Sequence, residues 1–570
     1  MREPSEQTEQ TPVTTSIWKP VGDGAWVGSR PSERYPVYTR GNAGEVYPEV
    51  FTPLSFSVAA ESGDVGFRNA VLRTGLVRRR DIAEASDVGV GNGVFGGYAY
   101  LNLTFARLVA LRLFGARLED VGVQFMGAGD PPAHRPDKRD RWILGTLRGI
   151  RYQWRTLRAT DPPPELARDQ QRVEEFLAGL PDPATASDSE LRGDIDDLMP
   201  MFADLFEQHL VISGQAGLAV GTLTNLCDQY LDDPSLAVTL LAGLGDIESA
   251  EPAQAMWDLS RIEPGSPEFD TAFAAFLAQH GCRGPNEWDT AFDTWATEPD
   301  LALVLIDRMR LADDSHEPAR QTARLARERI ETEGEALARL SGIRQRVFRR
   351  VLRSARRFSR ARERSKTTVV RAIHGSRLAA KELDRRLVER SGGQPGDLWF
   401  LTVDELDRYV ADPAAFSQTI AGRRRMHAEL HRRIPPFYFE GKLPPLDTWE
   451  LRDAPVERAE VGAVLTGLPG CPGTATGPAR VITDPADPAA LNPGDVLVAP
   501  LTDPSWTPLF VPAAAVIVDV GATMSHAVIV SRELGIPCVV SVTDATRRLT
   551  DGAIVTVDGS AGTVTVVESA

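Results

Sequence analysis

His526 stands where a β-branched run, residues 516–520, gives way to the apolar helical pattern of residues 527–534. A strand that leads through a glycine-containing loop into a helix places this side chain beside the free backbone N–H groups of the first helical turn. Such a helix end favours an anion and disfavours protonation of an imidazole. A neutral imidazole keeps a lone pair for nucleophilic attack. The pattern therefore predicts a histidine that can hold a phosphoryl group, and a histidine that merely caps the helix fits the local pattern equally well.

A second candidate is the cation pair Arg362 and Lys366, in the arginine-rich stretch of residues 344–390. The i,i+4 spacing places both cations on one face of a helix. Two cations together suit a phosphoryl group in transfer, because its charge lies on the equatorial oxygens. A solvated basic helix face is the competing interpretation.

Other histidines and glycines give weaker patterns. His427 and His431 have a spacing that can chelate zinc, but no third ligand is evident, so we expect an exposed basic helix and no metal site. His209 lies on an apolar helical stretch and is interpreted as a core histidine. Residues 91–96, "GNGVFG", match a dinucleotide-loop pattern formally, but no clear strand-to-helix context surrounds them.

Composition limits the class of protein. A formal net charge of −16 argues against a nucleic-acid binder. No apolar run has the length of a membrane span, and the polar N-terminus lacks the apolar segment of a secretory signal, so we expect neither a membrane partner nor secretion. The four cysteines are far apart and are interpreted as reduced thiols, which favours a cytoplasmic location.

The predicted secondary structure that must position these residues changes along the chain. We expect a disordered N-terminal tail at 1–30, a mostly helical domain at 31–440, a proline-rich hinge linker at 441–463, and a compact domain of short strands and helices at 464–570. The predicted fold class is multidomain α+β, with a mainly helical central domain followed by a compact C-terminal β/β/α domain.

The C-terminal segment resembles the phosphohistidine domain of the PEP-utilising enzymes, which include PEP synthase, pyruvate phosphate dikinase and rifampicin phosphotransferase. The likeness covers about 464–567 and rests on "GCPGTATGPARVI", "GDVLVAPLTDPSWTPLF", the "GATMSHAVIVSRELGIP" loop and helix, and "DGAIVTVDGSAGTV". It implies that His526 carries a phosphoryl group on a mobile, swivelling domain, with loop support from Gly521, Thr523, Ser525 and Arg532. For Arg532 the alternatives are anchoring of the helix and contact with the phosphoryl group. Two departures are Ala522 in place of a second glycine and Met524 in place of the regulatory threonine of the dikinases.

The upstream region is similar to the substrate-binding domain of rifampicin phosphotransferase. The matching segments are "GNAGEVYPEVFTPLSFS" (41–57), "HGCRGPNEWDTAFDTWATEP" (280–299), "RERSK" (362–366) and "GDLWFLTVDEL" (396–406). The resemblance adds weight to Arg362 and Lys366 as catalytic cations. It makes Glu45, Arg283, Glu287 and Asp289 weaker candidates, for which a buried arginine–carboxylate lattice between helices is an equally good interpretation.

An ATP-grasp module, which opens rifampicin phosphotransferase and PEP synthase, is not recognised before Asn42. Phenylphosphate synthase places this module on a separate subunit, and we expect the same division here. The prediction is a phosphotransferase subunit: a separate ATP-grasp partner, bringing ATP and Mg²⁺, charges His526, which passes the phosphoryl group to a hydroxyl of a small organic acceptor. The alternatives are a phosphohistidine carrier or regulatory protein, and a pseudoenzyme that binds a ligand without chemistry.

Overall fold

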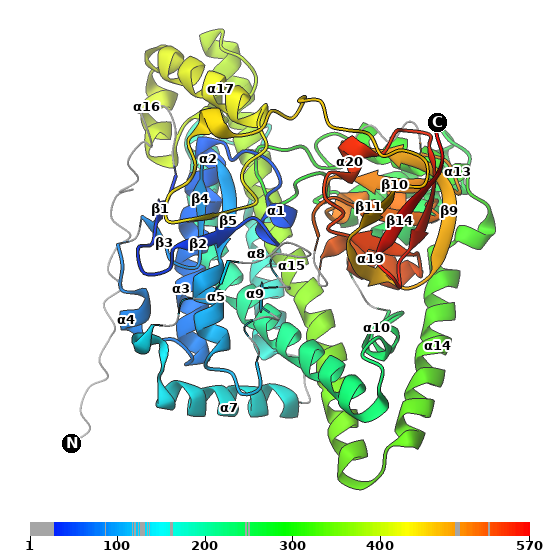
Figure 1. The fold of residues 1–570 in the computed structure, drawn as a ribbon. Helices are drawn as coiled ribbons and strands as arrows, with labels where there is room; N and C mark the ends of the chain where they lie inside the picture. Colours follow the sequence, from blue (N-terminus) through cyan, green and yellow to red (C-terminus); the bar gives the residue numbers. More distant parts are fainter. Residues whose placement is uncertain are drawn as a thin grey trace.

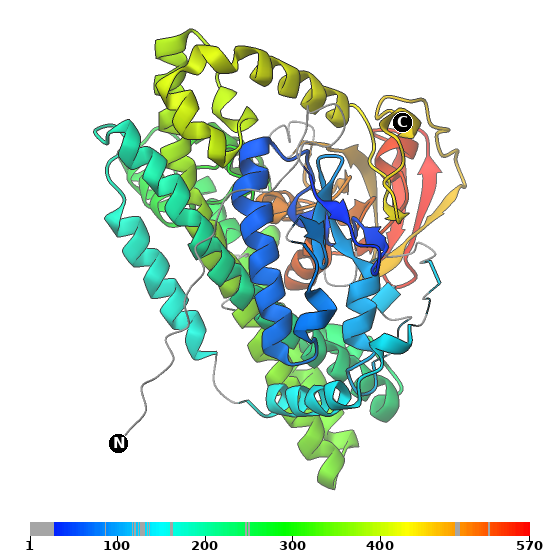
Figure 2. The same ribbon diagram turned by 90° about the vertical axis from the view of Figure 1, so that its left-hand side faces the viewer.

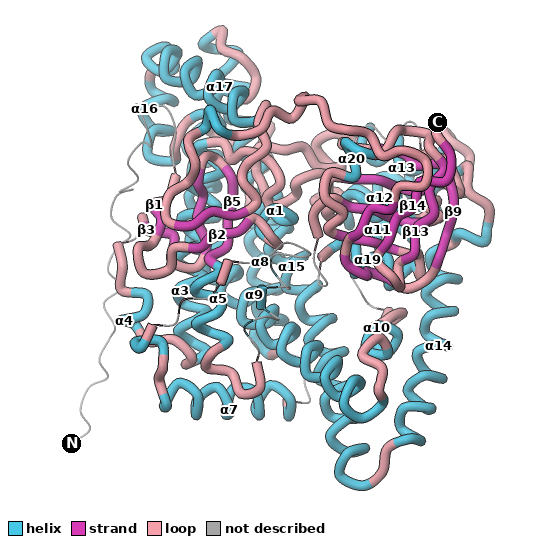
Figure 3. Tube along the Cα trace, viewed as in Figure 1, coloured by secondary structure: helices cyan, strands magenta, loops and turns pink. Residues whose placement is uncertain are grey.

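The computed structural model describes residues 28–570, apart from residues 86, 117, 119–120, 123–124, 126–131, 134, 136, 160–162, 246–247, 249–250, 485–490 and 522–524. Most of the expected N-terminal tail lies outside the described residues. Long helices run through the centre of the molecule, and the strands gather in two separate regions (Figure 3). The structure is thus mostly helical with a C-terminal sheet region, as the sequence predicted.

The first of these regions is a four-stranded sheet with strand order β4-β5-β2-β6. Its strands are β2 (Val37–Thr39), β4 (Asn92–Phe95), β5 (Tyr98–Asn102) and β6 (Tyr438–Glu440). The loop between β4 and β5 is Gly96–Gly97, and both glycines have positive φ, as a two-residue hairpin turn requires. The "GNGVFG" motif is therefore part of a β-hairpin. This agrees with the sequence analysis, which found no strand-to-helix context for a dinucleotide-binding loop there. Beside this sheet, β1 (Arg30–Pro31) pairs with β3 (Val88–Gly89).

Two long helices, α9 (Asp188–Leu231) and α15 (Gly342–Ser391), lie side by side through the helical part (Figure 1, Figure 2). A capping box of Ser187 and Glu190 starts α9, and Gly392 in the left-handed conformation ends α15. The helices around them are α3 (Ser62–Thr74), α7 (Ile143–Arg158), α8 (Pro164–Gly179), α14 (Pro318–Arg339) and α17 (Ser417–His431). Shorter elements are α1 (Ala43–Val46), α2 (Pro53–Ser55), η1 (Phe56–Glu61), α4 (Arg79–Ile82), α5 (Leu103–Ala110), η2 (Lys138–Asp140), α10 (Leu236–Leu240), η3 (Asp314–His316), η4 (Asp397–Phe400), η5 (Val403–Glu405), α16 (Leu406–Ala411), η6 (Pro413–Phe416) and η7 (Leu446–Thr448).

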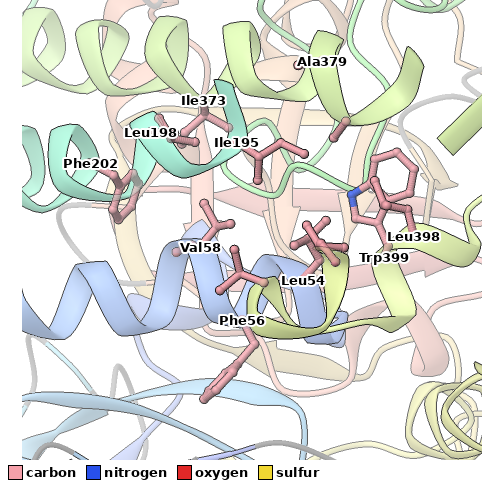
Figure 4. Close-up of a cluster of buried hydrophobic side chains, with 14 of the residues drawn as sticks. Leu54, Phe56, Val58, Ile195, Leu198, Phe202, Ile373, Ala379, Leu398 and Trp399 are labelled. Carbon is pink, nitrogen blue, oxygen red and sulfur yellow. The ribbon is translucent and has the colours of Figure 1, made fainter. Parts of the chain in front are cut away.

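The main core of the helical part forms where α9 and α15 meet the segment of α2 and η1. Figure 4 shows Leu54 and Val58 on the side of their segment that faces the two long helices, with Leu398 and Trp399 of η4 beside them, whereas the Phe56 ring points the other way. Among the described residues, α9 alone is long and apolar enough to cross a bilayer. Some of its residues, such as Leu198 and Phe202, are buried in this core.

The C-terminal region is an eight-stranded sheet with order β7-β14-β13-β9-β10-β11-β12-β8. Strands β9 to β12 are parallel to one another, and the flanking pairs are antiparallel. The strands are β7 (Val464–Thr466), β8 (Leu468–Cys471), β9 (Thr474–Val481), β10 (Val496–Ala499), β11 (Ala515–Val518), β12 (Cys538–Val540), β13 (Ile554–Asp558) and β14 (Thr563–Glu568). The helices are η8 (Pro504–Trp506), α18 (Thr507–Phe510), α19 (His526–Leu534) and α20 (Ala545–Arg548).

Both faces of the parallel strands are covered, as is usual for a parallel sheet. Val498 and Ile517 point into a core within the C-terminal region. Val516 and Val518 point to the opposite face and share a core with Phe510 of α18. That second core also includes helices from the middle of the chain, α11 (Glu251–Ser260), α12 (Pro267–His280) and α13 (Asp300–Arg310). In this structure the C-terminal sheet is therefore docked on the helical part through an apolar interface.

Two further expectations can be compared with the structure. The sequence spacing of Thr402 and Glu405 predicts a capping box, and the structure confirms it, since the Glu405 carboxylate accepts a hydrogen bond from Thr402 N–H at 2.9 Å. The residues "DLWF" have the pattern of a short strand, but that prediction is wrong, because Asp397–Phe400 form a 3-10 helix. The Asp384 carboxylate accepts from Gly396 N–H at 2.7 Å and from Leu398 N–H at 3.0 Å, which favours a tight turn over an extended strand. In the linker, Trp449 is buried against the N-terminal sheet, so the first part of 441–463 is anchored.

Candidate phosphohistidine site

His526 is the first residue of α19, which follows β11 in the chain after residues 519–525. Ser525 is the N-cap residue, and its hydroxyl accepts a hydrogen bond from Val528 N–H at 3.4 Å. Gly535 ends the helix in the left-handed conformation, with φ of 67°, and the chain returns as β12. The local fold is thus the strand–loop–helix unit that the sequence predicted, with His526 at the helix entrance.

Two threonines hold the His526 ring in place. The Nδ1 atom lies 3.1 Å from Thr502 Oγ1, and the Nε2 atom lies 3.2 Å from Thr507 Oγ1. Phe510 contacts the ring edge-on, at 6.0 Å between centroids. Because each ring nitrogen has one hydroxyl partner, the imidazole is oriented before any phosphoryl group arrives.

Burial is the main cause that lowers the pKa of His526 well below its usual value, and three cations of the helical part lower it further. In decreasing order of effect they are Lys366, Arg283 and Arg362. His526 is therefore neutral at physiological pH, the form that can act as a nucleophile. These cations belong to the docked helical part, so the structure places the candidate phosphoryl carrier next to the predicted cation pair.

The cations are linked by a buried carboxylate. Arg283 Nη1 lies 2.9 Å from Glu287 Oε1, and Lys366 Nζ lies 3.8 Å from the same oxygen. Arg283 also donates to Thr367 Oγ1 at 2.6 Å, which ties the loop after α12 to α15. Arg362 pairs with Glu363 at 2.9 Å. Three cations and two carboxylates leave a net positive charge, which suits an incoming phosphoryl group.

One hydrogen bond connects this loop directly to the C-terminal region. Asp503 Oδ2 accepts from the backbone N–H of Asn286 at 3.0 Å, and Asp503 Oδ1 accepts from Ser505 N–H at 2.8 Å. Burial raises the pKa of the Asp503 carboxyl. Since Asp503 follows Thr502, the residue that contacts His526 is next to the residue that contacts the helical part.

The remaining candidates from the upstream resemblance, Asp289 and Glu45, have no contact with His526 among the hydrogen bonds described above. Asp289 accepts from Ala291 N–H at 2.8 Å and from the Ser55 hydroxyl, so it ties this loop to α2. Glu45 lies on α1, whose following residue, Tyr47, contacts the Trp288 ring at 6.2 Å between centroids. These contacts agree with a role in holding the segments together.

The structure also gives the contacts of Arg532 and Gly521, two of the residues that the C-terminal resemblance singled out. Arg532 Nε donates to the Gly470 carbonyl at 3.3 Å, which anchors α19 on β8 and favours the anchoring alternative. Gly521 packs on β12, where an added Cβ would approach Val540 Cβ to 3.0 Å. Thr523 lies outside the described residues.

Sequence patterns alone predicted no functional role for Thr502, Asp503 or Thr507. The signal was present, because "LTDPSWTPLF" was among the segments that carry the resemblance, but only the folded chain shows which side chains turn toward His526. His427 and His431 engage different partners: His431 Nε2 pairs with Glu49 at 2.8 Å, and His427 Nε2 lies 3.3 Å from the Val50 carbonyl. Within the described ranges, no group of three or more histidine, cysteine or acidic side chains is arranged to hold a metal ion.

Comparison with known families bears on the resemblance that the sequence predicted. Residues 491–562 match the family described as PEP-utilising enzyme, mobile domain, and residues 261–363 match the rifampicin phosphotransferase fourth domain. The chain therefore contains the mobile domain of the PEP-utilising enzymes together with a region of the rifampicin phosphotransferase type, and the resemblance predicted from the sequence is confirmed.

Several individual relatives are similar over larger parts of the chain. The protein Rv2047c of Mycobacterium tuberculosis is 28% identical over 94% of this chain and 62% of its own length. The prodigiosin synthesizing transferase PigC of Serratia marcescens is 25% identical over 97% of this chain and 66% of its length. A rifampicin phosphotransferase of Streptomyces sviceus is 29% identical over 62% of this chain and 40% of its length. The chain thus spans less than two thirds of the length of each of these relatives.

Proposed function

We propose that this chain is a phosphotransferase subunit in which His526 carries a phosphoryl group and delivers it to a hydroxyl of a small organic acceptor. The observation that carries the proposal is the position of His526: a neutral imidazole at a helix entrance, facing Lys366, Arg283 and Arg362 across the docked interface. This arrangement supplies a nucleophile and a cationic surrounding for the same phosphoryl group. The named rifampicin phosphotransferase relative supports the same reaction class.

In the delivery step the acceptor oxygen bonds to phosphorus, and the bond between phosphorus and the His526 nitrogen breaks. The electron pair of that bond stays on the imidazole. Lys366 and Arg362 offset charge on the phosphoryl oxygens during transfer, and Arg283 fixes Glu287 so that Lys366 is held in place.

For the loading step we propose a separate ATP-grasp chain that brings ATP and Mg²⁺. The docked arrangement corresponds to the delivery position, because His526 faces the helical part. Loading requires the C-terminal region to leave this position, and the part of the linker that follows Trp449 is the segment on which it turns. The proposed location of these steps is the cytoplasm, and neither nucleic acid nor a membrane takes part in them.

The proposal can be tested without the loading partner. Phosphoramidate, a small phosphoryl donor, would be incubated with the protein, and the phosphorylated residue identified by ³¹P NMR and mass spectrometry. The proposal predicts one acid-labile phosphohistidine at position 526. Equal labelling of wild type and His526→Ala, with the label on another histidine, would overturn it.

A further inference from the structure

A second histidine lies beside the cation pair. His209 on α9 has its Nδ1 atom 2.9 Å from the hydroxyl of Ser365, the residue between Arg362 and Lys366 on α15. Burial lowers the pKa of His209 to about 3, and Arg362 and Lys366 lower it further. The same two cations act on His526. Arg362 and Lys366 are thus flanked by two neutral imidazoles, one on the mobile region and one fixed in the helical part.

The hydrogen bonds of Ser365 determine the tautomer of His209. The single hydroxyl hydrogen of Ser365 goes to the Arg362 carbonyl, 2.9 Å away, because a carbonyl can only accept. The Ser365 oxygen must then accept from His209, so the His209 proton is on Nδ1. The Nε2 atom keeps its lone pair, and its nearest polar contact is a long one, 3.4 Å from Ser213 Oγ.

The surroundings of His209 have the character of a binding site for an organic molecule. Its ring lies 5.8 Å from Trp288 and 6.4 Å from Phe206, between centroids. Phe206 and His209 both keep accessible surface, while Trp288 is buried. Among the described residues, no acceptor meets the buried Nε1–H of Trp288. A buried donor without a partner beside partly accessible rings indicates a place where a ligand supplies the missing oxygen.

We propose that His209 is a catalytic residue whose Nε2 atom receives the proton of the acceptor hydroxyl as that hydroxyl attacks the phosphoryl group on His526. The proposal rests on the proposed function. The acceptor O–H bond breaks and its proton forms a bond to His209 Nε2, while the acceptor oxygen bonds to phosphorus. The phosphorus–nitrogen bond breaks with its electrons left on His526. His209 then releases the proton to water, and the imidazole of His526 takes one up from water, so both rings end neutral and no further reactant is needed.

The same cations explain why the proton transfer is coupled to delivery. Without a phosphoryl group, burial keeps His209 unprotonated, and the positive charges of Arg362 and Lys366 add to that effect. A phosphoryl group on His526 brings negative charge to these cations and offsets their effect on His209. His209 becomes a better base when the group to be transferred is in place.

The test uses water, the smallest hydroxyl acceptor, and a protein charged with phosphoramidate. The decay of the phosphohistidine ³¹P signal is compared for wild type, His209→Gln and His209→Asn. The asparagine variant is informative because its amide N–H2 can replace Nδ1–H toward Ser365 but offers nothing at the position of Nε2. We expect unchanged charging in all three, decay at least about tenfold slower in both variants, and loss of the solvent deuterium isotope effect.

A matched control is His374→Asn. His374 is also on α15, burial also lowers its pKa to about 3, and it contacts Thr294 Oγ1 at 3.3 Å. This variant should decay like wild type. Wild-type decay in His209→Asn would overturn the assignment, and so would a ¹⁵N NMR spectrum of the unmodified protein that shows His209 protonated at Nε2. Failure of charging at His526 would instead count against the proposed function, so the two failures are distinguishable.

Discussion

The carboxylate of Asp503 accepts a hydrogen bond from the backbone N–H of Asn286 at 3.0 Å, across the interface between the C-terminal sheet region and the helical part. The neighbouring Thr502 contacts His526 Nδ1 at 3.1 Å. One dipeptide therefore links the position of the docked region to the orientation of the imidazole. Asn286 has a positive φ of 53°, in the left-handed region that asparagine tolerates better than most residues.

Replacement of Asp503 by alanine should weaken docking without preventing charging of His526. The Asn286 N–H would lose its buried acceptor, at a cost of about 1–3 kcal/mol to the docked state. We expect a broader interdomain distance distribution in double electron–electron resonance and slower phosphohistidine decay. The matched control is Asp551→Ala, because Asp551 also accepts from a backbone N–H, that of Val481 at 2.9 Å, but within the C-terminal region. Equal distance distributions for the two variants would refute a docking role.

Removal of Lys366 should separate delivery from loading. Lys366→Ala takes one cation from the phosphoryl position and should slow phosphohistidine decay about a hundredfold, with charging by phosphoramidate intact. Arg362→Ala should act in the same direction. Lys381→Ala is the control, since Lys381 is on the same helix and pairs with Asp293 at 2.6 Å. A Lys366 variant that cannot be charged would indicate a role in folding instead.

Arg283 should be important for stability. Its guanidinium and Glu287 are almost completely buried, so Arg283→Met leaves the Glu287 carboxylate with Lys366 alone, at 3.8 Å. Loss of one partner of a buried ion pair lowers the free energy of unfolding by about 3–5 kcal/mol. Because Lys366 remains as a partner of Glu287, we expect a loss near the lower end of this range. Urea unfolding at neutral pH measures it. Arg320→Met, which breaks the exposed pair with Glu317, should cost less than about 1 kcal/mol. Similar losses in the two variants would contradict the buried network.

Glu533 should make stability depend on pH. It lies on α19 against the backbone N–H groups of Gly243 and Leu244 in the helical part, and burial raises its pKa to about 7. Because the folded state binds this proton more tightly than the unfolded state, the Glu533 contribution to stability falls as pH rises between the two pKa values, by about 1.4 kcal/mol per pH unit. Below the unfolded pKa the contribution is fully retained.

Glu533→Gln removes this slope, so the variant should be more stable than wild type at about pH 8 and close to it at about pH 5. Asp519, whose pKa burial also raises to about 7, adds the same background slope to both proteins. Exposed Glu460→Gln serves as the control. If urea unfolding gives wild type and Glu533→Gln the same pH dependence, the carboxylate is not protonated in the folded state.

Local sequence patterns predicted the features that depend on neighbouring residues. The helix entrance at Ser525 and His526 was predicted, because a strand, a glycine, a cap residue and a helical period follow one another within 25 residues, 516–540. The i,i+4 spacing of Arg362 and Lys366 likewise predicted two cations on one helix face, and α15 contains both.

Contacts between residues that are distant in the sequence could not be predicted from local patterns. Strand β6 pairs with β2, with Val37 opposite Glu440, although the two strands are far apart in the sequence, and no local pattern reports such a pairing. His209 is the clearest example at the site. Its apolar helical surroundings predicted a core histidine, and only the packing of α9 on α15 brings it to Ser365, beside the cations. The functional roles of buried polar groups depend on partners that are distant in the sequence.

The most direct test of the account is whether His526 carries the phosphoryl group. The protein would be treated with ³²P-labelled phosphoramidate, and its acid-labile label compared between wild type, His526→Ala and the control His431→Ala, which removes a partly exposed histidine paired with Glu49. The account predicts label on wild type and His431→Ala, stable to base and lost in acid, and none on His526→Ala. Undiminished acid-labile label on a folded His526→Ala protein would contradict it.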